Sequence, residues 1–321
     1  MGSINESDSC IDTLPFPMDE SRPWFLYALR WRGSVIPSIL PRTLICGLFG
    51  LLIAVLYHYG LPVYVPVLVS IIPNVVLGLM LVFRTNTAYE RYWEGRKLWG
   101  NLINNIRNLA RNIWVVVQEQ EAGDRADKEA ALYTLAAFAV ATKLHLRDEP
   151  TNEELAELIT LERYQKLQSM NNPPLEVAFW ISDFLQQKFH QGAINVYQLN
   201  GMQELLNALV DNLGGCERIL KTPIPMAYAI HLKQLLLLYC FTLPFQLVQD
   251  LGFWTGPMVI LISFTLFGIE EIGIEIENPF GRDSNDLPLD TICKTIERNI
   301  NDLMSLEPST ARLKASSDRL D

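Results

Sequence analysis

The sequence contains 321 residues, of which 49% are hydrophobic and 19% are charged. The net charge of −10, from 26 basic and 36 acidic residues, argues against a general nucleic-acid-binding protein, because such proteins carry a basic face. The five cysteines are isolated, with no CxxC pair, so neither a zinc site nor a disulfide framework is indicated.

Residues 1–23 form a polar, acidic segment that lacks the basic and apolar regions of a signal peptide. We therefore expect this segment to stay in the compartment where it is made.

Four apolar stretches follow, and each is close to the roughly 20 residues that a helix needs to cross a bilayer core. They cover residues 42–60, 62–83, 230–249 and 253–271. Prolines interrupt several of them, which transmembrane helices tolerate better than soluble core helices do. Buried helical hairpins in a soluble protein are the alternative, but two near-adjacent charge-free runs are hard to bury. The pattern predicts four transmembrane helices.

Loop charges predict the orientation of these helices. Arginines precede the first stretch and follow the second, whereas the short link between the two, 58–60, has no Lys or Arg. The link between the last two stretches, 249–252, also lacks a basic residue. We therefore expect both short links to lie outside and both termini to lie in the cytosol.

The polar segments 84–222 and 276–301 are expected to form a large cytosolic helical region. After Arg84, apolar or aromatic residues recur mostly at the helical spacing of three or four. They are Tyr89, Tyr92, Trp93, Leu98, Leu102, Ile106, Leu109 and Ile113. Further helices are expected to start after Asn152 and to cover 175–192 and 203–220. Residues 302–321 are expected to be disordered. The fold class is therefore an all-α membrane protein.

No catalytic motif is visible in the sequence. The four histidines occur in no metal-binding motif, and there is no HExxH, GxSxG, Walker A loop or GxGxxG. Together with the membrane architecture, this pattern favours a channel, transporter or scaffold over an enzyme.

The second apolar stretch carries a stripe that has two interpretations. Leu68, Ile72, Val76 and Met80 are spaced four apart and share one helix face. Such a face commonly packs against lipid or other helices. In an oligomer, a ring of such stripes would instead form an apolar constriction that gates by dewetting.

Three motifs resemble those of the bestrophin family. FRTNTAYERYWEGRKLWG, 83–100, follows the second stretch, and IENPFGRDSNDLPLD, 276–290, follows the fourth. TPIPMAY, 222–228, is a weaker match before the third stretch. The resemblance covers about residues 24–301 and implies a homopentameric ion channel with four spans per subunit. It also implies that the second span lines the pore and that most members conduct chloride, whereas some bacterial relatives resemble cation channels.

The resemblance also implies pore positions. One alignment places three apolar neck rings at Leu68, Ile72 and Val76, and another places them at Ile72, Val76 and Leu79. Met80 belongs to the same apolar stripe, and Asn74 is a candidate polar donor beside it. The cytosolic aperture is expected within 194–199, at Tyr197.

The polar turn after the fourth span resembles a calcium clasp of animal members. Four residues would supply oxygen ligands: Glu275, Asn278, Asp283 and Asp286. The alternative is that the turn caps helices and docks the cytosolic region. The four acids at 270, 271, 275 and 277 are expected to pair with Arg84, Arg91 and Arg96, since buried charges need partners.

The sequence thus predicts a multi-pass channel of the cell (inner) membrane or the thylakoid membrane, whose partners are chloride, the lipid bilayer and four further copies of the chain. A cation channel of the same fold and a non-conducting membrane scaffold are the alternatives.

Overall fold

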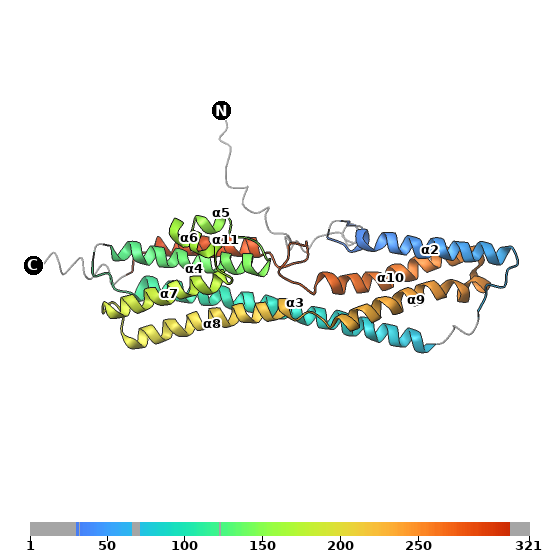
Figure 1. The fold of residues 1–321 in the computed structure, drawn as a ribbon, viewed down its shortest axis with the longest axis horizontal. Coiled ribbons are helices and arrows are strands. Elements are labelled where there is room, and N and C mark those ends of the chain that lie inside the picture. Colours follow the sequence, from blue (N-terminus) through green and yellow to red (C-terminus); the bar gives the residue numbers. More distant parts are fainter. Residues whose placement is uncertain (1–29, 32, 66–70, 122, 309–321) are drawn as a thin grey trace, which may run out of the picture. The chain divides into compact units, whose positions relative to one another are not determined.

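The computed structural model describes residues 30–31, 33–65, 71–121 and 123–308, without the side chains of 71–73. Every regular element in these ranges is a helix (Figure 1). The chain divides into two compact units. The described residues within 30–94 and 221–286 form what we call the apolar unit, and those within 95–220 and 287–308 form the polar unit.

Among the described residues, four long helices and one short one build the apolar unit. They are α2 (Ile36–His58), the first part of α3 (Ile71–Val116), α9 (Met226–Leu251), the 3₁₀ helix η2 (Gly252–Trp254) and α10 (Thr255–Glu275). Two stretches of the described chain are long and apolar enough to cross a membrane: Ile36–His58 and Met226–Glu275. The second stretch contains both α9 and α10, separated at Gly252, whose φ of +52° suits glycine. The number of membrane crossings stays a prediction.

The core of the apolar unit lies between its helices. Leu77 and Leu81 of α3 are almost fully buried and belong to one cluster with Leu232 and Leu236 of α9. Residues of α2 and α10 complete this cluster, among them Ile39, which is fully buried. Contacts between α2, α9 and α10 are extensive, as Figure 1 shows for the blue and orange helices. One face of α3 is therefore fixed against the other helices of its unit.

Glycines let α2 and α10 approach closely. A Cβ added at Gly50 would lie 3.2 Å from the Cα of Gly256, and one added at Gly256 would lie 2.4 Å from Leu51 Cγ. Small residues allow such contacts between helices that cross membranes. Gly78 lies on α3 within the second predicted span. A Cβ added there would have no atom of another part of the described chain within 4 Å.

The polar unit contains the second part of α3 and six further helices among the described residues. These are α4 (Asp124–Leu146), α5 (Glu153–Ala156), α6 (Leu161–Gln168), α7 (Pro173–His190), α8 (Val196–Lys221) and α11 (Leu289–Met304). The predicted amphipathic pattern of α3 is confirmed within this unit, because Leu102, Ile106, Leu109 and Ile113 are fully buried. In the apolar unit, by contrast, Tyr89 and Trp93 are about half exposed in the chain.

Side-chain caps set several helix starts in the polar unit. Asn152 accepts a hydrogen bond from the Leu155 amide, as expected, but the helix it caps has only four residues. Asn172 caps α7, which starts at Pro173 instead of 175 because proline is well suited to a first helical turn. Helix α8 starts at Val196, seven residues before the predicted 203.

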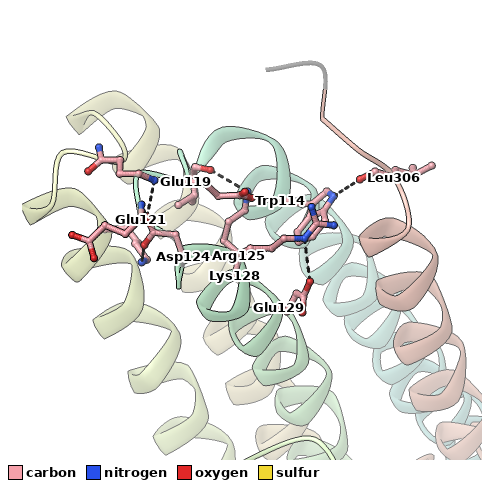
Figure 2. Close-up of polar contacts among 11 residues, drawn as sticks. Trp114, Glu119, Glu121, Asp124, Arg125, Lys128, Glu129 and Leu306 are labelled. Carbon is pink, nitrogen blue, oxygen red and sulfur yellow. Dashed lines mark hydrogen bonds and ion pairs between the residues drawn. The ribbon is translucent and has the colours of Figure 1, made fainter. Parts of the chain in front are cut away.

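Trp114 near the end of α3 joins three segments of the polar unit (Figure 2). Its Nε1 donates to the backbone carbonyl of Leu306, which follows α11, over 2.8 Å. The side chains of Arg125 and Lys128, from α4, lie over its ring at 5.3 and 5.1 Å. Lys128 also donates to Glu119 over 2.9 Å, and Asp124 accepts from the backbone amide of Glu121 over 2.8 Å. The described chain is thus ordered into helix to Met304, past the boundary predicted at 301.

Two buried lysines hold the helices of the polar unit together. Lys188 of α7 bonds Asp124 and Asp127 of α4, at 2.6 and 2.9 Å. The hydrogen bond from Lys188 and two backbone amides hold the pKa of Asp124 far below its usual range. Lys143 of α4 bonds Glu154 and Asp290. Burial lowers the pKa of Lys143, but these two bonds outweigh it, so the net pKa is raised.

Candidate functional site

One face of α3 in the apolar unit is exposed and carries no charge. Its side chains are Val75, Val76, Leu79, Val82 and Phe83. Asn74 is exposed as well, but it lies on the side of Leu77 and Leu81, near the start of the described helix. The opposite face, at Leu77 and Leu81, is buried against α9. Helical geometry explains the contrast, because residues three or four apart share a face. An apolar surface of this size on a long helix is suited to lipid, to another copy of the chain or to a pore.

The residues predicted for the neck lie at different places on this helix. Val76 and Leu79 belong to the exposed face, with 45% and 52% of their surface accessible. Met80 is partly buried and packs against the core of the apolar unit. Leu68 and the side chain of Ile72 lie outside the described residues. Val76 and Leu79 therefore share the uncovered face, whereas Met80 turns toward the other helices.

The polar candidate on the same helix is also accessible. Asn74 is exposed, one turn before Gly78. Because the residue is exposed, its amide is able to donate a hydrogen bond to a species beside the helix, although Asn74 lies on another side of α3 than Val76 and Leu79. The exposure continues to Phe83, which the apolar stripe in the sequence did not include.

Tyr197, predicted for the cytosolic aperture, lies in the first turn of α8 and is 84% exposed. Reciprocal hydrogen bonds form a cap just before it. Asn195 Oδ1 accepts from the Gln198 amide over 3.0 Å, and Gln198 Oε1 accepts from the Asn195 amide over 2.8 Å. The cap explains why α8 begins at this point and presents the tyrosine ring to its surroundings.

The polar turn after α10 is held by hydrogen bonds among its own residues. Glu275 accepts from the Asn285 side chain, and Asp286 accepts from the Asp283 amide over 2.7 Å. Asn278 Oδ1 accepts from the Phe280 amide over 3.3 Å. Phe280 is fully buried and anchors the turn. Much of the turn is thus explained by its own structure.

Calcium binding by the four residues of the expected clasp stays a prediction. No group of three or more His, Cys, Asp or Glu residues suited to a metal ion occurs in the part of the chain that the structure describes. Calcium needs about six to eight oxygen ligands, several of them carboxylates.

Glu277, next to this turn, connects three segments of the apolar unit. Its Oε2 pairs with Arg84 Nη2 of α3 at 2.6 Å, and its Oε1 accepts from the Ile224 amide over 3.0 Å. Its backbone carbonyl accepts from Arg91 Nε over 3.2 Å. Arg91 also donates to the carbonyl of Thr222. Burial lowers the pKa of Arg91, although the Glu277 carboxylate opposes this shift.

The pairing predicted for the acids is confirmed in part. Glu277 pairs with Arg84, but Glu270 and Glu271 lie 3.8 and 3.1 Å from Arg42 of α2 instead. The pattern of charges in the sequence did not identify Arg42 as the partner. Only the packing of α2 along α10 brings this arginine to the acids.

The sequence and the fold were compared with known proteins. The family model described as "Bacterial/Fungal Bestrophin protein" matches residues 17–302. A protein of Nostoc sp. is 65% identical over 286 residues, covering 89% of this chain and 93% of its own length. One of Synechocystis sp. is 56% identical over 292 residues, covering 91% and 95%. Both are named voltage-dependent anion channel-forming proteins.

Solved structures show the same fold. The crystal structure of a bacterial bestrophin homologue from Klebsiella pneumoniae matches with a TM-score of 0.76 and 29% sequence identity. The match covers 84% of this chain and 100% of that chain.

Proposed function

This chain belongs to the bestrophin family, and from this premise we propose that it is a channel that conducts chloride and other anions passively through a homopentameric pore lined by α3. The observation that carries the proposal is the exposed, uncharged face of α3 from Val75 to Phe83, opposite the buried Leu77 and Leu81. The names of the cyanobacterial relatives, as voltage-dependent anion channel-forming proteins, support the same activity.

Five copies of α3 around one axis would turn this face inward. Rings of Val76 and Leu79 would then narrow the pore, and such an apolar ring opens or closes by wetting and dewetting. No basic residue occurs among residues 71–83, so anion preference would come from backbone dipoles and from donors such as the Asn74 amide.

The ion pair of Glu277 supports anions over cations as the conducted ions. Glu277 lies against Arg84. Glu270 and Glu271, by contrast, share Arg42 and are compensated only in part. An acid that is paired one to one with an arginine contributes little attraction for a passing cation. Conduction of sodium by the same fold is the second candidate, and a non-conducting scaffold is the third.

The loop charges support a multi-pass arrangement with both termini in the cytosol, in a cell membrane or a thylakoid membrane. Control by calcium stays a prediction, because the described residues hold no group of three or more His, Cys, Asp or Glu side chains suited to a metal ion. Recording with and without a calcium chelator tests it.

The reversal potential of the purified protein in a planar bilayer, under a sodium chloride gradient, tests the proposed function. We expect it to move toward the chloride equilibrium potential, and to move away again when gluconate replaces chloride on one side. A shift toward the sodium equilibrium potential would make the protein a cation channel. A folded, reconstituted protein without current would favour the scaffold.

A further inference from the structure

Glu277 makes contacts with three parts of the apolar unit from one short turn. The residue lies two positions after the end of α10. Its carboxylate binds Arg84 of α3 with one oxygen and the Ile224 amide, just before α9, with the other. Its backbone carbonyl accepts from Arg91, which lies seven residues after Arg84 on α3. Two positions on α3 are thus tied to the segments that enter α9 and leave α10.

Arg84 depends on this carboxylate. The arginine is 5% exposed, and Glu277 is its ion-pair partner, at 2.6 Å. Its Nη1 is buried and has no hydrogen-bond partner among the described residues. The stem of the side chain lies across Gly273 of α10, where an added Cβ would be 3.4 Å from Arg84 Cγ. A buried guanidinium that loses its ion-paired carboxylate is strongly destabilised, so the pair fixes the place of Arg84.

The position of Arg84 constrains the exposed face of α3. Helix α3 continues without a break through Leu79 and Val76, which precede Arg84 by five and eight residues. At a rise of about 1.5 Å per residue, these side chains lie roughly 8 and 12 Å along the helix from the ion pair. A helix is stiff over two turns, so a rotation or shift at Arg84 is passed to both residues.

We propose that Glu277 is a positioning residue that latches α3 to the turns flanking α9 and α10, and thereby restrains the opening of the pore. This inference rests on the proposed function. Release of the latch leaves α3 free to rotate or move outward, which would part the apolar rings.

Single-channel recording of Glu277→Gln, Arg84→Gln and the double variant tests the latch. We expect each single change to raise the open probability at a fixed voltage by about fivefold or more, the range of coupling energies between sites in proteins. The double variant should differ less than about twofold from either single variant, because the same contact is already lost. Effects that multiply in the double variant, or an unchanged open probability in Glu277→Gln, would overturn the proposal.

Glu271→Gln is the matched control, since it removes the same charge from a buried glutamate that pairs with Arg42 of α2 instead of with α3. Its open probability should stay within about twofold of the unmodified channel. If the open probability of Glu271→Gln rose as much as that of Glu277→Gln, the effect would come from charge or stability in general, and the proposed latch would be wrong.

Hydrogen exchange of the purified, full-length protein separates failure of the latch from failure of the proposed function. The Ile224 amide donates to Glu277, so segment 222–228 should exchange faster in Glu277→Gln, and less so in Glu277→Asp, which keeps the charge. If segment 222–228 exchanged faster in Glu277→Gln but no variant carried current, the contact made by Glu277 would be supported and the proposed channel function would be rejected. Unchanged exchange in a folded Glu277→Gln protein would reject the latch.

Discussion

Asp290, at the start of α11, shows how single residues hold the polar unit together. Its carboxylate bonds Lys143 of α4 and Arg147, the residue that follows α4, each at 2.9 Å. Lys143 is almost fully buried, so its charge is tolerated only because Asp290 and Glu154 surround it. Burial alone would raise the pKa of Asp290, but the bonds to Lys143 and Arg147 prevail and lower it from its ordinary 3.8 to about 2.

Asp290→Asn should destabilise the polar unit in a pH-dependent way. Because the folded pKa of Asp290 is depressed, its stabilisation is present above about pH 4 and is lost as the pH falls toward 2. Since the carboxylate is half exposed, we expect a loss of about 1 to 2 kcal/mol at pH 7. Thermal unfolding of the unmodified protein and of Asp290→Asn across this pH range measures the loss. The difference between their unfolding midpoints should shrink at acidic pH.

Asp302→Asn, on the same helix, is the control, because Asp302 is exposed and makes no ion pair among the described residues. If both variants melted alike at pH 7, the role given to Asp290 would be wrong.

At the scale of the helix, one element can serve two environments. Helix α3 has a buried, well-packed face in the polar unit, at Leu102 to Ile113, and a face in the apolar unit that no described helix of that unit covers. In the same unit, α2 and α10 contact each other at Gly47, Gly50 and Gly256, so these two helices are closely packed against each other. Close packing at this pair leaves little room for change.

Gly256→Ala should therefore weaken the α2–α10 contact. The new methyl group would lie 2.4 Å from Leu51 Cγ and 3.2 Å from the Gly47 carbonyl, and the backbone atom cannot move aside cheaply. Overpacking of this kind costs about 1 to 3 kcal/mol. Thermal unfolding in detergent should show a lower midpoint for this variant.

Gly214→Ala in α8 has open space around the added methyl group and should be neutral or slightly stabilising, since alanine favours helix. Equal midpoints for the two glycine variants would show that α2 and α10 are less tightly packed than the structure indicates.

At the scale of the whole molecule, the proposed pore would be a property of the assembly. The described part of one chain leaves Val76, Leu79 and Phe83 on α3 and Tyr197 on α8 exposed. The proposed pentamer would enclose these side chains by repeating α3 around an axis. Its narrowest point would therefore depend on how the copies meet.

Val76→Ala should raise the unitary conductance by about 1.5- to 2-fold, because each subunit in the ring loses two methyl groups from an apolar constriction. Planar-bilayer recording measures the effect. Val115→Ala is a matched control: Val115 lies on the same helix, with 48% exposure against 45% for Val76, but in the polar unit. A constriction at another residue would be indicated if both valine variants conducted like the unmodified channel.

The helical class, the cap-bearing start at Asn152 and the family could be predicted from the sequence, because hydrophobic period, capping residues and motifs are local properties. The pairing of the acids at 270 and 271 with Arg42 could not, since this contact joins residues far apart in the chain and depends on packing. For Glu277, the charges in the sequence predicted the pairing with Arg84, but the bond of its carbonyl to Arg91 and that of its carboxylate to the Ile224 amide exist only once the apolar unit is folded.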